Sequence, residues 1–217
     1  MRGKLIVIEG TDSSGKATQS NMLIERLNND GILVSKFSFP AYDTPTGKIV
    51  GGPYLGKSYM CESWFKEGID NVDPMVASLY YAADRKYNIA SIEEKLNAGI
   101  NVILDRYTYS NMAHQGGKIA DPEEREKMYK LLETLEFETL NLPHADIRIF
   151  LHMPYEASLA LKSGERNKEH LIKAETAYVE LAKKYDFYTI ECISENGVRT
   201  IQDISNELYN YVKKELQ

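Results

Sequence analysis

The sequence predicts an α/β fold in which a five-stranded parallel sheet is flanked by helices. Two observations lead to this prediction. Short apolar runs alternate along the 217 residues with longer segments in which apolar residues recur at helical spacing. Each helical segment is also long enough to form the right-handed crossover that joins two parallel strands. Nothing in the sequence marks a second domain, so residues 1–217 are expected to form a single domain.

The expected strands are apolar runs bounded by polar or turn-forming residues. The first contains four consecutive aliphatic residues, Leu5 to Ile8, which indicates a strand buried on both faces. Pro40 ends the second, because proline cannot donate a hydrogen bond within a sheet. The five expected strands are 4–9, 32–39, 101–106, 146–153 and 187–192.

The expected helices begin and end at recognisable residues. Asp73 and Asp121 each precede a proline, which is typical of an N-cap followed by proline at the first helical position. Gly31 and Gly99 end the helices that precede them. The expected helices cover 16–29, 73–98, 121–138, a segment from Pro154, a segment that ends near Lys184, and 200–215. Residues 40–72 are rich in Gly, Tyr and Pro and are expected to form loops and short helices, while the charge run at 123–130 is expected to be a solvated helix face.

Composition excludes several classes of partner. The net charge of −6 argues against a protein that binds nucleic acid or membrane through global positive charge. The apolar stretch at the N-terminus is too short for a signal peptide or a membrane span. Two cysteines, Cys61 and Cys192, form neither a disulfide framework nor a metal-ligand spacing, so we expect reduced thiols in a cytoplasmic protein.

The segment EGTDSSGKAT, from Glu9 to Thr18, follows the first strand and opens the first helix. It matches the phosphate-binding pattern G-x-x-x-x-G-K, in which backbone N–H groups point at phosphate oxygens. The alternative is a chance match within a Gly/Ser turn, which the strand before it and the helix after it disfavour. The residues expected to bind ATP are Gly10, Ser13, Ser14, Gly15, Lys16, Ala17 and Thr18.

Ala17 departs from this pattern. The residue after the lysine normally supplies a hydroxyl to Mg²⁺, and alanine has none. Thr18 is one position later and is expected to bond a phosphate rather than the metal. Asp105 ends the third strand at the same edge of the sheet, so it is the expected Mg²⁺ carboxylate, with a turn-capping aspartate as the alternative.

Four motifs occur in order along nearly the whole chain: E-G-x-D-x-x-G-K at Glu9–Lys16, F-P-x-Y-x-T at Phe39–Thr44, A-D-R at Ala83–Arg85, and D-R-Y-x-x-S-N-x-A-x-Q-G at Asp105–Gly116. Together with AYVELAKKY at 177–185 they resemble the thymidylate kinase family of nucleoside monophosphate kinases. The resemblance implies a three-layer fold of the P-loop nucleoside triphosphate hydrolase type with a short lid. It further implies phosphoryl transfer from MgATP to dTMP, giving dTDP for dTTP biosynthesis, in a homodimeric enzyme.

The resemblance also assigns the acceptor site. Tyr81 and Arg85 are four residues apart and therefore share one helix face. The resemblance implies that the ring stacks on thymine while the guanidinium reaches its O4 edge. Asn111 would offer a donor and an acceptor to the base, and Arg106 would hold the acceptor phosphate. The alternatives are core packing for Tyr81, a solvated salt bridge for Arg85 and a structural ion pair for Arg106. The full expected set for dTMP is Asp12, Phe39, Tyr42, Tyr81, Arg85, Arg106, Asn111, His114 and Gln115.

The lid is expected at about 162–170, where basic and polar residues interrupt the helical pattern. Because the phosphate loop carries no basic residue besides Lys16, a lid cation should neutralise charge on the transferred group. Lys162, Arg166 and Lys168 are the candidates, and Arg166 is favoured for its two-pronged geometry. Glu165 is expected to be the acidic residue of the lid. The expected catalytic residues are therefore Lys16, Asp12, Arg106 and Arg166.

Two alternatives remain open at this point. One is a kinase for another nucleoside monophosphate or for a deoxynucleoside on the same fold. The other is a nucleotide-dependent switch that binds a protein partner. The switch is disfavoured because the sequence has no guanine-reading N-K-x-D motif and would not need the acceptor-site residues.

Overall fold

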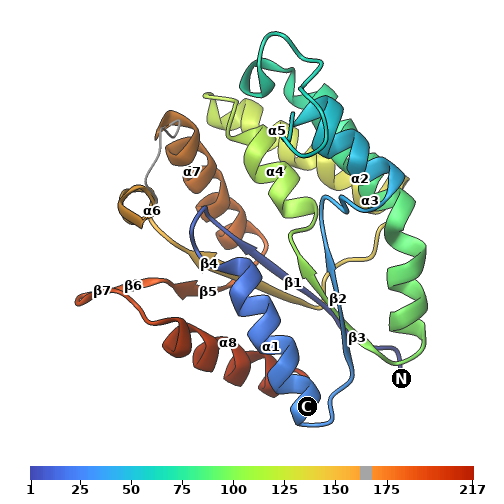
Figure 1. Cartoon of the computed structure of the whole chain (residues 1–217), viewed down its shortest axis with the longest axis vertical. Coiled ribbons are helices and arrows are strands. Elements are labelled where there is room, and N and C mark those ends of the chain that lie inside the picture. Colours follow the sequence, from blue (N-terminus) through green and yellow to red (C-terminus); the bar gives the residue numbers. More distant parts are fainter. Residues whose placement is uncertain (162–167) are drawn as a thin grey trace.

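Five parallel strands form the central sheet of the computed structural model, which describes residues 1–161 and 168–217 (Figure 1). The strands lie in the order β2-β3-β1-β4-β5. Their bounds are β1 (Leu5–Gly10), β2 (Val34–Ser38), β3 (Asn101–Asp105), β4 (Ile147–His152) and β5 (Tyr188–Glu191). The predicted parallel sheet is confirmed, with β1 between β3 and β4. A short antiparallel hairpin of β6 (Ile193–Ser194) and β7 (Gly197–Val198), which was not predicted, follows β5.

Eight α-helices are described, and most begin where the sequence indicates. They are α1 (Lys16–Asn29), α2 (Pro45–Ile49), α3 (Pro74–Asn97), α4 (Thr108–Gly116), α5 (Pro122–Glu133), α6 (Tyr155–Leu161), α7 (Lys168–Lys184) and α8 (Ile201–Glu215). Short segments η1 (Val50–Tyr54) and η3 (Thr134–Thr139) are π-helical, and η2 (Ile69–Asn71) is a 3₁₀-helix. The side chains of Asp73 and Asp121 accept N–H bonds in the first turns of α3 and α5, so both predicted N-caps are confirmed.

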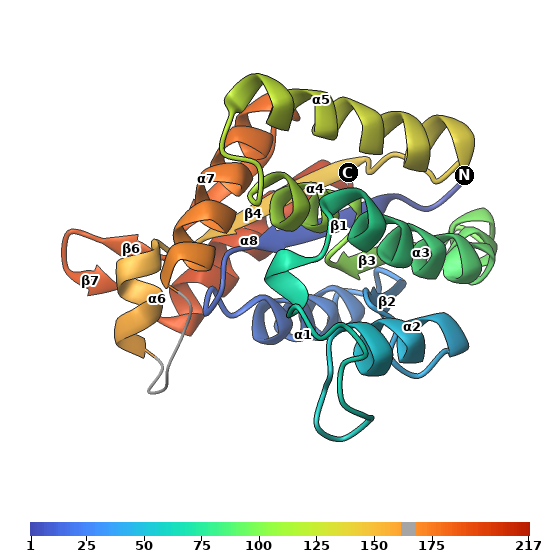
Figure 2. The same ribbon diagram turned by 90° about the horizontal axis from the view of Figure 1, so that it is seen from above.

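Helices cover both faces of the sheet, which gives the expected three layers. Figure 2 shows the sheet between α5 and α7 on one side and α1 on the other. Side chains of β1 alternate between the two cores, with Leu5 and Val7 facing α3, α4, α5 and α7, and Ile6 and Ile8 facing α1 and α8. Leu5 to Ile8 are fully buried, as four consecutive aliphatic residues predict.

Two expectations for the middle of the chain differ from the structure. The sequence did not indicate α4, because all its residues except His114 are buried and it therefore has no amphipathic pattern. The charge run at 123–130 is not wholly solvated: Arg125 is buried and its guanidinium pairs with the Glu180 carboxylate at 2.7 Å. Across the described part of the chain, no helix combines the length and apolarity needed to cross a membrane.

Candidate active site

The phosphate loop lies between β1 and α1, at the carboxyl edge of the sheet. Ser13 and Gly15 adopt left-handed backbone conformations, with φ of 61° and 76°, and so turn the chain sharply into α1. Within the described residues, the N-terminus of α1 receives no side-chain cap, whereas the N-termini of α2, α3, α5 and α8 each have one. The first N–H groups of α1 are therefore available to an anion.

A cleft of about 480 Å³ opens in front of this loop. It is lined by Asp12, Ser13, Gly15, Lys16, Ala17, Thr18, Asp105, Arg106 and Leu161. Five of the seven residues expected to bind ATP line it. The other two lie beneath the cleft. Ser14 is buried, and its hydroxyl donates to the Thr11 carbonyl oxygen at 2.8 Å. A Cβ at Gly10 would lie 2.7 Å from the Leu151 carbonyl oxygen.

Lys16 is held inside the loop by two carbonyl groups. Its ammonium donates to the carbonyl oxygens of Gly10 and Thr11 at 2.6 and 2.9 Å. Burial, and then the positive charge of Arg106, lower the pKa of Lys16 to about 7. Entry of phosphate groups into the cleft would restore the charge, because an anion beside the ammonium favours its protonated form.

The metal-binding capacity of the cleft rests on two carboxylates. Asp12 and Asp105 line it together, and the Asp105 carboxylate is 3.8 Å from the ammonium of Lys36. Ala17 is exposed in the same cleft and offers no hydroxyl. The described residues include no cluster of three or more metal-binding side chains. Mg²⁺ is usually held by one or two carboxylates together with substrate phosphates, so the residues present fit a metal that arrives with a nucleotide.

Arg106 connects this cleft to a second cavity. It adopts a left-handed backbone with φ of 70°, and its Nη1 lies within 3.4 Å of Ser110 Oγ, His114 Nε2 and Tyr178 Oη. Burial tends to lower the pKa of Arg106, but Tyr178 and the carboxylates of Glu9, Asp105 and Asp12 outweigh it and raise the pKa. Arg106 is thus a fixed cation between the two spaces.

The second cavity has a volume of about 160 Å³. It is lined by Phe39, Pro40, Tyr42, Leu55, Tyr81, Arg85, Arg106, Tyr107, Ser110, Asn111 and His114. Seven of the nine residues expected to bind dTMP are among them. Asp12 lines the neighbouring cleft, and Gln115 is buried outside the lining. Burial raises the pKa of Tyr42 to about 12 and also raises that of Tyr81, so both hydroxyls keep their protons and can donate.

At one end of this cavity, Arg85 and Asn111 share a partner that the sequence analysis missed. Arg85 is 2% exposed and pairs through Nε and Nη2 with the Glu136 carboxylate. Asn111 Nδ2 donates to Glu136 Oε1 at 3.1 Å and to the Ser78 carbonyl at 3.2 Å. The solvated salt bridge considered for Arg85 is therefore wrong, because the arginine lies in a buried ion pair.

Two further residues of the site place their hydroxyls beside Arg106. The sequence did not single them out, although both lie inside the motifs given above. Ser110 follows Asp105 in the D-R-Y motif, and Tyr178 belongs to AYVELAKKY. Their hydroxyls are 2.8 Å apart, and each lies within hydrogen-bond distance of the Arg106 guanidinium. Glu136 had only a weak signal, as one of two acidic residues in the segment LEFETL.

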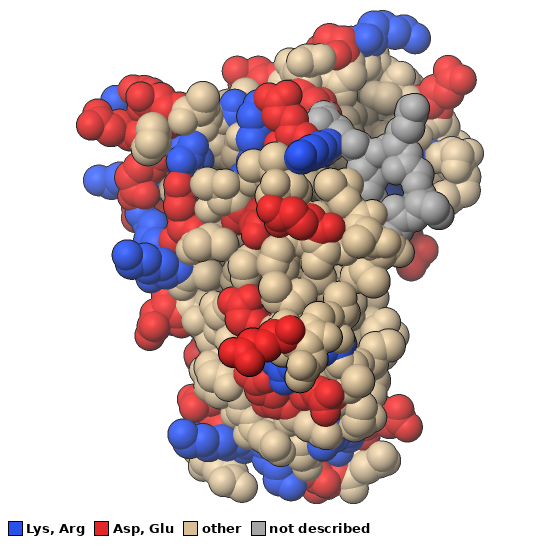
Figure 3. Space-filling view, turned by 90° about the vertical axis from the view of Figure 1, so that its left-hand side faces the viewer, with Lys and Arg blue, Asp and Glu red and all other residues tan. Residues whose placement is uncertain are grey.

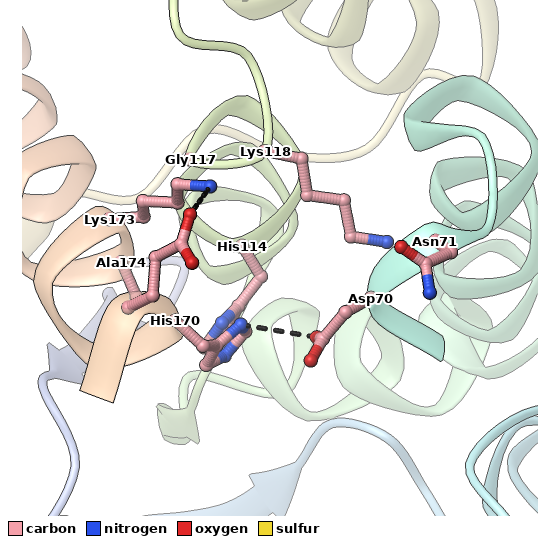
Figure 4. A pocket seen from close by; sticks show the side chains of 9 residues that line it. Asp70, Asn71, His114, Gly117, Lys118, His170, Lys173 and Ala174 are labelled. Carbon is pink, nitrogen blue, oxygen red and sulfur yellow. Dashed lines mark ion pairs between the residues drawn. The ribbon is translucent and has the colours of Figure 1, made fainter. Parts of the chain in front are cut away.

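A cavity of about 310 Å³ lies on the other side of His114 (Figure 4). His114 stacks on His170 with ring centroids 5.6 Å apart, and His170 Nδ1 is 3.3 Å from the Asp70 carboxylate. Burial, and then Arg106, keep the pKa of His114 well below its usual value, so this ring is neutral at pH 7.

The predicted lid residues Lys162, Glu165 and Arg166 lie outside the described residues. Lys168 begins α7, and its ammonium is 5.6 Å from the centroid of the Tyr155 ring.

On the face drawn in Figure 3, Lys and Arg residues are interspersed with Asp and Glu.

Comparison with known proteins finds thymidylate kinases over most of the chain. A family model described as thymidylate kinase matches residues 8–204. The thymidylate kinase of Schizosaccharomyces pombe is 28% identical over 215 residues, which cover 97% of this chain and 92% of the relative. That of Plasmodium falciparum is 30% identical over 215 residues, which cover 98% and 91%. The solved structure of thymidylate kinase from Candida albicans matches with a TM-score of 0.75 and 24% identity, over 100% of this chain and 94% of that one, and shares its fold.

The lowered pKa of Lys16 predicts a pH-dependent affinity for ATP. Below about pH 7 the ammonium is already charged, whereas at higher pH the free protein loses a proton that the bound phosphates restore. The dissociation constant of ATP, measured by calorimetry, should therefore rise by up to about tenfold per pH unit between about pH 7.5 and 9. Lys16→Arg should bind with little pH dependence in this range, because arginine stays charged. A wild-type affinity that is constant up to pH 9 would contradict this.

Proposed function

Because the chain belongs to the thymidylate kinase family, we propose that it transfers the γ-phosphoryl group of ATP to dTMP and forms dTDP and ADP. The main support for the proposal is that a cleft and a cavity share Arg106 in their linings. One is a phosphate-loop cleft, and the other is a cavity with aromatic walls and a polar end. This arrangement suits a donor triphosphate and an acceptor monophosphate whose phosphate groups face each other across one arginine.

Catalysis in this proposal consists mainly of positioning and charge neutralisation. The N–H groups of α1 and the Lys16 ammonium hold the donor phosphates. The Arg106 guanidinium binds the dTMP phosphate and directs its oxygen in line at the γ-phosphorus. No strong base is needed, because the acceptor phosphate is already an anion. Asp12, which lines the donor cleft, would contact the sugar 3′-hydroxyl, and Tyr42, which lines the acceptor cavity, would donate its hydroxyl to the acceptor phosphate.

Magnesium enters this proposal through the carboxylates of the cleft. Asp105 and Asp12 would hold the ion, directly or through water, together with ATP phosphate oxygens. When bound, Mg²⁺ neutralises charge on the β- and γ-phosphates. Arg166 as the lid cation and Glu165 as the lid acid rest on the sequence alone.

We also infer a homodimer that forms through α3. Val76, Leu79, Ala83 and Tyr87 recur at spacings of three and four along this helix and are exposed. Leu79 and Tyr87 are 49% and 59% exposed. An apolar stripe on a helix is typical of a surface that packs against another helix, and a second copy of the chain would supply an identical one.

A cytoplasmic location is the simplest setting for this activity. Both cysteines are free thiols, with Cys61 exposed and Cys192 buried. Exposed free thiols are more common in reducing compartments.

Steady-state assays with MgATP and a panel of dTMP, dUMP, UMP, dCMP, dGMP and AMP test the proposal directly. We expect the highest kcat/KM for dTMP, because the cavity of about 160 Å³ has aromatic walls and carries the polar groups of Arg85 and Asn111 at one end. Lys16→Met should abolish turnover while the protein stays folded by circular dichroism. A purine monophosphate or UMP as the best acceptor would contradict the proposed substrate.

Ala17 provides a second prediction. Ala17→Ser restores the hydroxyl that usually contacts Mg²⁺, so the Mg²⁺ concentration that gives half-maximal activity should fall several-fold, by about 3- to 10-fold. Thr18→Ser, which changes the adjacent exposed hydroxyl residue conservatively, serves as the control and should leave this concentration unchanged. The measurement is a magnesium titration at fixed ATP. An unchanged magnesium requirement in Ala17→Ser would show that the missing hydroxyl does not limit metal binding.

Leu79→Glu tests the dimer. A carboxylate in the centre of the apolar stripe should convert the dimer to a monomer in sedimentation velocity runs, because burying the charge is costly. Leu33→Glu, at a position 65% exposed outside the stripe, is the matched control and should remain dimeric. A wild-type monomer, or a dimer that persists in Leu79→Glu, would refute the assignment.

A further inference from the structure

We propose that Glu136 is a positioning residue that fixes the hydrogen-bonding pattern of the acceptor cavity and so selects a 4-keto pyrimidine over a 4-amino pyrimidine. Thymine and uracil are 4-keto pyrimidines, and cytosine is the 4-amino counterpart. This inference rests on the proposed function, since it concerns the base of the acceptor nucleotide. Glu136 acts through Arg85 and Asn111, which line the cavity, whereas Glu136 itself does not.

Glu136 is a fully buried carboxylate whose oxygens are used entirely inside the protein. It lies in η3, the π-helical continuation of α5, and is 0% exposed. Its two oxygens accept bonds from Arg85 Nε and Nη2, from Thr108 Oγ1 at 2.9 Å and from Asn111 Nδ2 at 3.1 Å. A buried carboxylate whose oxygens are all bonded in this way holds its donors in one geometry. π-helical turns are frequent at functional sites.

The carboxylate determines which way the Asn111 amide faces. Nδ2 is directed at two acceptors, Glu136 Oε1 and the Ser78 carbonyl. A flipped amide would place Oδ1 against both of these oxygens and would lose two hydrogen bonds. Oδ1 is therefore fixed on the opposite side, where it is buried and has no hydrogen-bond partner among the described residues. A buried acceptor without a partner is costly, and a donor on the ligand would satisfy it.

Arg85 is oriented by the same carboxylate. Nε and Nη2 point at Glu136, which leaves Nη1 outside the pair. A guanidinium has only donors, so whatever it presents to the cavity is a donor. The polar end of the cavity thus combines an acceptor from Asn111 with a donor from Arg85.

This pattern matches one class of pyrimidine. A 4-keto pyrimidine carries an N3–H donor and an O4 acceptor side by side, which complement Asn111 Oδ1 and the Arg85 guanidinium. Cytosine carries an N3 acceptor and a 4-amino donor. Its N3 would therefore face the Asn111 Oδ1 acceptor, and its amino group would face the Arg85 donor. A site built from buried hydrogen-bonding groups discriminates strongly against such a mismatch.

Glu136→Gln removes the constraint with little change in side-chain volume. The glutamine amide has one acceptor oxygen, and its NH₂ group would face either Arg85 or the Asn111 Nδ2. Where this NH₂ group faces Asn111, the Asn111 amide keeps only the Ser78 carbonyl as an acceptor and can turn its own NH₂ group toward the ligand. A flipped Asn111 would suit the N3 acceptor of cytosine.

The test compares kcat/KM for dTMP, dUMP and dCMP in the wild type and in Glu136→Gln. We expect dTMP and dUMP to lose about 10- to 100-fold together, because both present the same ring edge. The loss for dCMP should be smaller, so that the ratio of dTMP to dCMP falls by at least about tenfold. Glu138→Gln, at an exposed position in the same π-helical segment, is the control and should leave all three values unchanged.

The ratio distinguishes positioning from a loss of folding, because a reduced fraction of active enzyme lowers all three values equally. Where dCMP turnover is too slow to follow, its inhibition constant against dTMP gives the same comparison. An equal loss for all three acceptors, or an unchanged ratio, would overturn the inference even if the wild type is a dTMP kinase. Failure of the proposed function would instead appear in the wild type, as a lack of preference for dTMP.

Discussion

The buried carboxylate of Glu9 joins the two halves of the candidate site. Glu9 is in β1, immediately before the phosphate loop, and is 0% exposed. Its Oε1 accepts the backbone N–H groups of Tyr107 and Ser110 at 2.8 and 3.0 Å, and so caps the N-terminus of α4. Its Oε2 accepts the Ser110 hydroxyl. The strand that leads to the donor cleft and the helix that carries the acceptor site are thus held together by one side chain.

Burying the Glu9 carboxyl group at this junction disfavours its charged form, and neighbouring hydrogen bonds and positive charges oppose that effect. Burial raises the pKa of Glu9, while hydrogen bonds from Ser110 and Tyr107 and the charges of Arg106 and Lys16 act in the opposite direction. Arg106 in turn depends on Glu9, Asp105 and Asp12 for its stabilisation. Carboxyl groups and cations are therefore grouped together at the junction. Two phosphate-bearing substrates that enter would face cations already fixed in position, which is how preorganised charge contributes to phosphoryl transfer.

The sequence predicted the parts of the molecule that local chemistry determines. The β1 strand and the capped starts of α3 and α5 depend on residues adjacent in the chain, and all are confirmed. The α4 helix was missed because it is buried on nearly all sides. The pairing of Arg85 with Glu136 was missed because the two residues are 51 positions apart. Spacing along a helix indicated that Arg85 and Tyr81 share a face, but only the tertiary structure shows what orients the guanidinium.

A crystal structure of the full chain with dTMP and a non-hydrolysable ATP analogue would show whether the two substrates meet at Arg106. We expect the monophosphate group on the Arg106 guanidinium, the triphosphate over the N-terminus of α1, and thymine N3 within hydrogen-bond distance of Asn111 Oδ1. A pyrimidine seated in the cavity between His114 and Lys118, or a monophosphate that does not contact Arg106, would contradict this expectation.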